Sequence, residues 1–217
     1  MAALRSSRVR SILALASCVL GAAIVASSVA PLRAADTEMR ALWVRRASID
    51  SPDAIRKMVA AASTAGFNTL FVQAGGDGAA PASGFDPITQ TITIAHAAGL
   101  RVHAWVDVTR VAAPDELPTD REHVIYLHPD WLMVPRAIAA ELIELDTHSP
   151  DYLGTLERWT RLNNARIDGL YVSPLQSDVA AHIAESVRAL VRQYALDGIY
   201  LDHVQYPGDD FDYGQRS

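Results

Sequence analysis

The chain has 217 residues, half of them hydrophobic, and a formal net charge of −6 at pH 7. This length suffices for one well-packed domain and is short for two ordinary ones. Lysine occurs only once, at Lys57, and phosphate binding needs clustered Lys and Arg, so the composition argues against a nucleic-acid-binding protein.

The first 34 residues are predicted to form an export signal. Three arginines within the first ten residues precede an uncharged apolar run over residues 12–30, and Ala34 or Ala35 follows as a cleavage point. This order of basic, apolar and small residues is typical of a secretory signal peptide. Two alternatives stay open. The run is nearly long enough for an uncleaved membrane anchor, and the residues before Cys18 resemble a lipoprotein signal.

The signal predicts an exported protein of the periplasm, the cell envelope or the extracellular space, and any membrane attachment would be through this segment alone. Arginine and alanine dominate the basic and small residues, as in many GC-rich bacterial coding sequences. Cys18 is the only cysteine. A protein cleaved after it would have none, so neither a disulfide nor thiol chemistry is expected.

Apolar runs alternate with helical patterns from Met39 onward, and most of the runs begin with a glycine. Strand, helix, strand at roughly thirty-residue spacing indicates βαβ units and a parallel sheet. The interval between the third and fourth runs is longer, about 65 residues, and is interpreted as an elaborated loop over one face of the sheet. Strands are predicted within residues 39–46, 65–73, 98–108, 168–174 and 197–207. Helices are predicted from Ser51, over 88–98, around 152–162 and from a cap at Ser177 or Asp178.

Two architectures fit this alternation, a doubly wound sheet and a (β/α)8 barrel. A doubly wound nucleotide-binding protein should carry Gly-x-Gly-x-x-Gly after its first strand. The first strand here is followed by residues without glycine, and in the GGDGAAP stretch Pro81 occupies the third glycine position. A barrel instead places its functional residues at the carboxyl ends of strands, and polar residues gather there in this chain. They are Arg45, Arg46, Gln73, Asp77, Asp107, Ser173, Asp202 and His203.

The sequence therefore predicts an α/β protein, a partial (β/α)8 barrel over residues 36–217. A complete barrel usually needs about 250 residues. About five βα units are expected in this chain, which looks truncated after the fifth strand.

Six motifs carry a family resemblance. They are MRALWVRR, GFNTLFVQAGGDG, GLRVHAWVDVTR, HPDWL, LYVSP and DGIYLDHVQYP, in this order from Met39 to the end of the chain. The chain thereby resembles the bacterial glycosyl-hydrolase-like 10 family, which implies an exported barrel acting on glycans, in some members on peptidoglycan strands. Two positions depart from the family pattern. Ser173 stands where the family usually has an acid before the proline, and His203 follows Asp202 where the acid is often doubled.

Glycoside hydrolysis normally needs two carboxyl groups. Asp202 is the first candidate, because it follows the apolar run Ile199 to Leu201 at a strand end; the alternative is a structural cap. Asp107 ends the third strand and is the second candidate. It could instead orient the substrate, since the resemblance implies an amide there. Asp77, a loop acid beside glycines, is a weaker candidate.

Four further residues are predicted to bind substrate. Sugar rings stack on aromatic faces, which suits Trp105 and Tyr206, although Trp105 could equally be a core residue. Gln73 could bind sugar hydroxyls, and His203 could bind substrate or influence Asp202. Neither a metal site nor a cofactor is predicted, because the seven histidines are scattered along the chain.

The resulting prediction is a glycoside hydrolase that acts on a polysaccharide or a peptidoglycan glycan strand by acid/base catalysis with paired carboxylates. The alternative is a non-catalytic glycan-binding relic or fragment of such a barrel, because a fold alone does not establish an activity.

Overall fold

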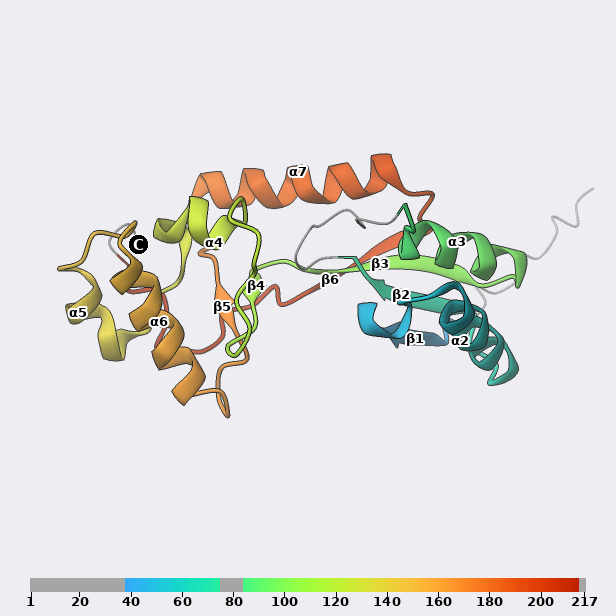
Figure 1. Ribbon diagram of the computed structural model, residues 1–217, viewed down its shortest axis with the longest axis horizontal. Helices are drawn as coiled ribbons and strands as arrows, with labels where there is room; N and C mark the ends of the chain where they lie inside the picture. The colour runs from blue at the N-terminus through green and yellow to red at the C-terminus, as the bar shows by residue number, and fades with distance from the viewer. Residues whose placement is uncertain (1–37, 75–83, 215–217) are drawn as a thin grey trace, which may run out of the picture. The chain divides into compact units, whose positions relative to one another are not determined.

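The computed structural model describes residues 38–74 and 84–214 (Figure 1). The predicted export signal over residues 1–34 and the candidate Asp77 lie outside the described residues. Among the helices that are described, none combines the length and the hydrophobicity needed to cross a membrane.

The described residues contain a four-stranded parallel sheet (Figure 1). Its strands lie in the order β1 (Ala41–Val44), β2 (Thr69–Gln73), β3 (Arg101–Asp107) and β6 (Gly198–Asp202). Every neighbouring pair is parallel. This confirms the βαβ arrangement and the fold class, a partial (β/α)8 barrel.

Helices connect these strands as the sequence predicts. They are α2 (Pro52–Thr64), α3 (Pro87–Ala97) and α7 (Ser177–Gln193), and a short 3₁₀ turn, η1 (Arg46–Ser48), follows β1. The Ser51 hydroxyl accepts a hydrogen bond from the Ala54 N–H and caps α2. The threonines of α3 do not prevent helix formation, because the Thr91 hydroxyl donates to the Pro87 carbonyl one turn earlier. The predicted cap of α7 is wrong by one residue or more, since Gln176 is its N-cap and Ser177 its first residue.

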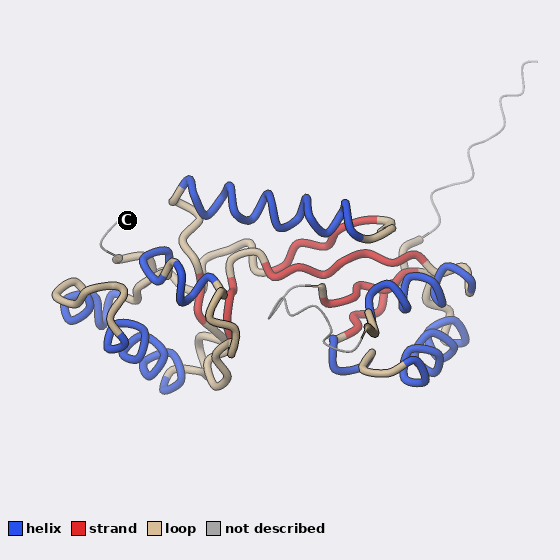
Figure 2. The backbone as a smooth tube through the Cα atoms, turned by 45° about the horizontal axis from the view of Figure 1, so that its top comes forward, coloured by secondary structure: helices blue, strands red, loops and turns tan. Residues whose placement is uncertain are grey.

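One predicted strand does not belong to the parallel sheet. Within residues 168–174 only β5 (Leu170–Tyr171) forms, and it pairs antiparallel with β4 (Arg110–Ala112) in a separate two-stranded sheet (Figure 2). A Cβ on Gly169 would lie 2.3 Å from the Ala112 carbonyl oxygen. This glycine therefore permits the close approach of two short strands, not the turn after a helix that the sequence pattern suggested.

Because β6 pairs directly with β3, it is the fourth strand of the barrel, and residues 108–176 form a long excursion between the third and fourth strands. The excursion is more than an elaborated loop, because it packs a hydrophobic core of its own around Ile125, Leu132 and Tyr152. Besides β4 and β5 it contains α4 (Val124–Leu127), η2 (Pro129–Trp131), η3 (Arg136–Ile138), α5 (Ala139–Leu142) and α6 (Pro150–Leu162).

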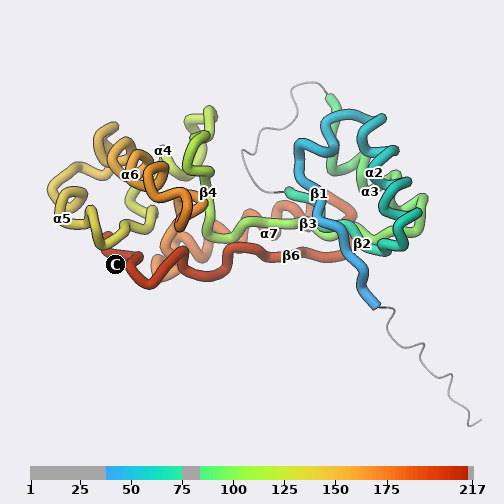
Figure 3. The backbone as a smooth tube through the Cα atoms, turned by 90° about the horizontal axis from the view of Figure 1, so that it is seen from below, coloured from blue at the N-terminus to red at the C-terminus, as the bar shows by residue number. Residues whose placement is uncertain are grey.

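The two faces of the parallel sheet differ. One face packs on α2 and α3 through buried aliphatic residues such as Leu70 and Val102. The other carries aromatic rings: Phe71 stacks on Tyr200 with ring centroids 4.7 Å apart, and Trp43 meets Phe71 edge-on at 5.2 Å. This second face is the inner face of the barrel, and β3 and β6 run side by side along it (Figure 3).

Candidate active site

Asp107 and Asp202 are the last residues of adjacent strands and lie in register with one another. Residues paired across a parallel sheet project to the same face, so both carboxylates point to the inner side of the barrel. The sheet pairing continues one residue further, where the Val108 N–H donates to the Asp202 carbonyl at 2.8 Å. The strand pairing itself therefore brings together the two acids that the sequence singled out.

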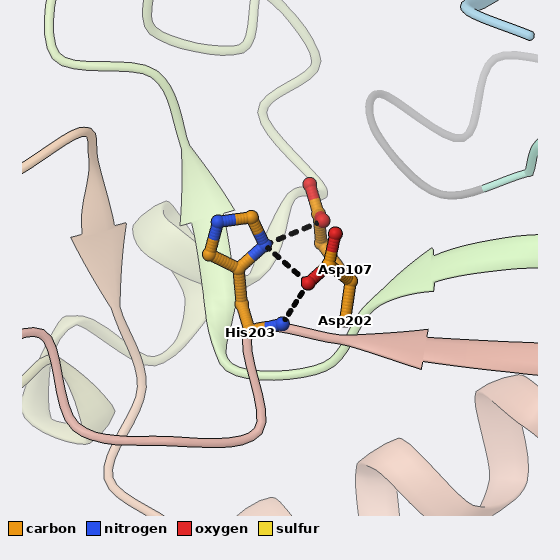
Figure 4. A group of neighbouring side chains, drawn as sticks. All are labelled: Asp107, Asp202 and His203. Atoms are coloured by element: carbon orange, nitrogen blue, oxygen red, sulfur yellow. Dashed lines mark hydrogen bonds and ion pairs between the residues drawn. The ribbon is translucent and has the colours of Figure 1, made fainter. Parts of the chain in front are cut away.

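The His203 side chain lies beside the carboxylates of Asp107 and Asp202 (Figure 4), and it also faces Asp168 in the excursion. Its ring Nδ1 lies 2.8 Å from Asp107 Oδ1, its Nε2 lies 3.3 Å from Asp168 Oδ2, and its backbone N–H donates to Asp202 Oδ1 at 2.9 Å. The backbone takes a φ of +49°, a left-handed conformation that costs a non-glycine residue on the order of 1–3 kcal/mol. The chain thus turns sharply directly after Asp202, and this turn places the imidazole between Asp107 and Asp168.

Arg110 holds the other side of Asp107. Its Nη2 donates to Asp107 Oδ2 at 2.7 Å, and its Nη1 lies 3.6 Å from Asp168 Oδ2. Burial alone would lower the pKa of Arg110, but the hydrogen bond and charge of Asp107 raise it above its ordinary value. The Arg110 Nε is buried and finds no acceptor among the described residues.

Asp168 is fixed in place by three neighbours. The Tyr171 hydroxyl donates to its Oδ1 at 2.5 Å, and Arg110 and His203 face its Oδ2. Burial would raise the pKa of Asp168, yet these partners lower it below its ordinary value. Burial and then Asp168 itself raise the pKa of Tyr171. Asp168 is therefore an ionised carboxylate that reaches the strand ends from the excursion.

Of Asp107, Asp202 and His203 at the strand ends, Asp202 has the most exposed side chain. Its side chain is 32% exposed, against 14% for Asp107 and 17% for His203. Its Oδ2 accepts a hydrogen bond from the Trp105 indole N–H at 2.9 Å. The indole predicted as a stacking platform thus contacts the candidate catalytic carboxylate directly.

The other two predicted substrate residues, Gln73 and Tyr206, make no hydrogen bond to this group within the described residues. The Gln73 amide oxygen accepts from the Arg46 N–H at 3.2 Å, and Gln73 lines a cleft of about 700 Å³ together with Asp107 and Arg110. Tyr206 is exposed, and slight burial together with the charge of Asp212 raises its pKa. The carboxylate whose charge acts on Tyr206 is therefore Asp212.

Sequence reasoning missed three residues, Asp168, Arg110 and Asp212. Asp168 and Asp197 each precede a glycine and an apolar run in the sequence, but the structure places them at different ends of the strands. Asp197 accepts from the Val102 N–H at 2.7 Å, at the start of β3, whereas Asp168 belongs to the site. Asp212 accepts a hydrogen bond from the buried Ser173 hydroxyl, and burial raises the pKa of Asp212. An acid thus lies beside position 173 after all, supplied from another part of the chain.

The spacing of the two strand-end acids bears on chemistry. One oxygen of Asp107 and one of Asp202 lie within 4.8 Å of each other. Carboxyl groups are about 5–5.5 Å apart in retaining glycosidases and about 6.5–9.5 Å apart in inverting ones. The two oxygens are therefore close enough for the retaining spacing. Asp107 is paired with two side chains that can carry positive charge, Arg110 and His203. Asp202 accepts hydrogen bonds from an indole and a backbone N–H and is the more exposed of the two acids.

Known proteins share both the sequence pattern and the fold of this chain. The family model Glycosyl hydrolase-like 10 matches residues 77–216. No curated protein sequence matches the chain. Among solved structures, a hypothetical protein from Ruminiclostridium thermocellum ATCC 27405 shares the fold at a TM-score of 0.51 and 11% identity, over 78% of this chain and 80% of that one. A noncanonic maltogenic alpha-amylase AmyB from Thermotoga neapolitana aligns at a TM-score of 0.47 and 12% identity, over 77% of this chain and 39% of that one.

Proposed function

The chain belongs to the glycosyl hydrolase-like 10 family, and from this premise we propose that it hydrolyses a polysaccharide or peptidoglycan glycan strand with Asp202 as its catalytic carboxylate. The observation that supports this role is the position of Asp202. It is the most exposed of the three groups at the carboxyl ends of β3 and β6, where barrel enzymes carry their active sites.

The neighbours of Asp202 would orient it for attack or proton transfer. The Trp105 indole N–H and the His203 backbone N–H each donate to one of its oxygens, so its carboxylate plane is fixed from two sides. Asp107 would act as a second carboxylate at near-retaining spacing, or as a fixed anion that holds His203 and Arg110.

Substrate contacts would come from the cleft beside Asp107. Gln73 lines this cleft and is our candidate for binding a sugar hydroxyl. Trp105 and Tyr206 are the candidates for stacking on sugar rings. We also propose that residues 1–34 are a cleaved export signal, so that the barrel domain of residues 36–217 meets its glycan in the cell envelope or outside the cell.

The proposal is tested by incubating the full chain with a panel of purified polysaccharides and peptidoglycan glycan strands. Release of new reducing ends, absent in an Asp202→Asn variant and retained in Asp209→Asn, is the expected result. Asp209 is a matched control, an exposed acid seven residues further along the same segment. Glycan binding without any release of reducing ends would favour the alternative, a non-catalytic glycan-binding protein.

A further inference from the structure

We propose that Asp107, Asp202 and His203 bind a divalent cation, Zn²⁺ or Mn²⁺, at the carboxyl ends of β3 and β6. One atom of each side chain faces a shared space: Oδ1 of Asp107, Oδ1 of Asp202 and Nδ1 of His203 (Figure 4). These potential ligand atoms lie within 4.8 Å of one another, and all three residues are partly buried.

The distances between the candidate ligand atoms are close to those that a shared ion needs. His203 Nδ1 lies 2.8 Å from the Asp107 oxygen and 3.9 Å from the Asp202 oxygen. Ligand atoms around one ion lie about 3–3.5 Å apart, since metal–ligand bonds are about 2.0–2.2 Å long. Side-chain rotations that bring Asp202 Oδ1 about half an ångström nearer to His203 Nδ1, and draw the two carboxylate oxygens together from within 4.8 Å, would give a coordination geometry.

Each of the three side chains also makes a polar contact through its other oxygen or nitrogen, the one that does not face the shared space. The outer contacts are Arg110 to Asp107 Oδ2 at 2.7 Å, Trp105 to Asp202 Oδ2 at 2.9 Å and Asp168 to His203 Nε2 at 3.3 Å. Metal-binding histidines commonly donate their other ring N–H to a carboxylate, and ligating carboxylates are themselves hydrogen-bonded. All three candidate ligands have such an outer partner, and Asp202 Oδ1 also accepts from the His203 backbone N–H at 2.9 Å.

The balance of charges in the group also favours binding of a cation. The group holds three carboxylates, Asp107, Asp168 and Asp202, and the Arg110 guanidinium pairs with the first two of them. The His203 ring has a carboxylate against each nitrogen, whereas a neutral imidazole carries only one N–H. When the single N–H is on Nε2 and donates to Asp168, the unprotonated Nδ1 and the Asp107 carboxylate both present lone pairs to each other. A cation bound between Nδ1 and Asp107 would pair with both.

The donor set indicates which ion fits. Carboxylates suit Mg²⁺, Ca²⁺ and Mn²⁺, whereas imidazole suits Zn²⁺ and its transition-metal neighbours, so a mixed set favours Zn²⁺ or Mn²⁺ over Mg²⁺. Three protein ligands leave at least one coordination position for water or for a hydroxyl group of a bound glycan. The scattered histidines gave no sequence signal for this site, because its one imidazole comes from the end of β6 and its first carboxylate from β3, nearly a hundred residues earlier.

The experiment measures metal content and needs no activity. The full chain is dialysed against ZnCl₂, MnCl₂ or MgCl₂, and bound metal is quantified by mass spectrometry. We expect close to one equivalent of Zn²⁺ or Mn²⁺ per chain. His203→Gln and Asp107→Asn should weaken binding at least tenfold, and Asp168→Asn, which removes an outer partner, by about 10–100-fold.

A matched control exists at the opposite end of the sheet. His96 Nε2 lies 2.8 Å from Asp197 Oδ2, a second His–Asp pair with no third ligand in the described part of the chain. His96→Gln should leave metal binding unchanged. If the site variants unfold by circular dichroism, Co²⁺ loaded into the wild-type chain supplies the test, and a visible spectrum distinct from aqueous Co²⁺ is expected.

Three results would overturn the proposal: no stoichiometric metal on folded wild-type chain, undiminished binding in folded His203→Gln, or a Co²⁺ spectrum identical to that of the aqueous ion.

Discussion

The indole N–H of Trp105 donates to the Asp202 carboxylate at 2.9 Å, from one strand of the barrel to the next. Trp105 lies in register with Tyr200, so this hydrogen bond runs diagonally across the inner face to the end of β6. It connects the predicted stacking residue to the predicted catalytic acid. The two proposed functions therefore share a hydrogen bond, and a substitution can separate them.

Trp105→Phe retains an aromatic face and removes the donor. A hydrogen bond to a charged group contributes about 1.5–3 kcal/mol, which corresponds to roughly a tenfold to hundredfold change in rate if the bond orients Asp202 for catalysis. We expect kcat on a cleaved glycan to fall by that factor while glycan binding changes little. Steady-state kinetics and affinity electrophoresis measure the two effects. Weaker binding with normal kcat would instead make Trp105 a stacking residue only.

Close packing between β6 and β3 can be tested at Gly198. A Cβ there would lie 2.8 Å from the His103 ring, so Gly198→Ala should destabilise the fold by about 1–3 kcal/mol. Gly154, inside α6, would place a Cβ in open space, with no contact under 4 Å outside its own helix, and Gly154→Ala should stabilise by about 0.5–1 kcal/mol. Urea unfolding measures both. Equal effects of the two substitutions would contradict the observed approach of β6 to His103.

Most of the parallel sheet could be predicted from the sequence, because β1, β2, β3 and β6 are apolar runs separated by amphipathic helices. The pairing of β5 with β4 could not, since a two-residue strand has almost no local pattern and its partner lies about sixty residues away. The sequence predicted that residues 168–174 form a barrel strand between β3 and β6. That prediction separated Asp107 from Asp202, which are in fact paired in register.

The same limit applies to the site residues. Asp202 and Asp107 could be found because strand-end acids are visible in a sequence. Arg110 and Asp168 could not, because their importance arises only where the excursion returns to the strand ends. Asp168 and Asp197 have identical Asp-Gly contexts, and only tertiary placement assigns one to the site and the other to the start of β3.

The stability of the chain should depend on pH through Asp197. Partial burial would raise the pKa of Asp197, but hydrogen bonds from the Val102 N–H and His96 lower it below the ordinary value of 3.8. An acid with a lowered folded-state pKa stabilises the fold above its unfolded pKa, and this contribution is lost as the pH falls through the folded value. Asp197→Asn should therefore be less stable than wild type at neutral pH, by about 1–2 kcal/mol.

Urea unfolding between pH 7 and pH 3 checks this dependence. The difference between wild type and Asp197→Asn should be constant near neutral pH and should shrink below about pH 4, as wild-type Asp197 becomes protonated. A difference that grows as the pH falls would contradict the assigned hydrogen bonds.

Export can be checked by sequencing the amino terminus of the mature protein after expression in a bacterial host. A start at Ala35 or Asp36 is expected, because the apolar run and the small residues at its end form a cleavable signal. A mature protein that begins at a lipid-modified Cys18 would instead show a lipoprotein. An uncleaved Met1 in the membrane fraction would show an anchor.

Turnover of a cleaved glycan by Asp202→Asn tests the central claim most directly. The substitution keeps the size of the side chain, and it removes the charge and the titrating oxygen. General acid or base groups contribute about 10²–10⁴-fold, so we expect a loss of that size, with the urea midpoint and glycan affinity nearly unchanged. Near-normal turnover in a folded Asp202→Asn variant would contradict the assignment, and loss of folding together with activity would make Asp202 a structural cap.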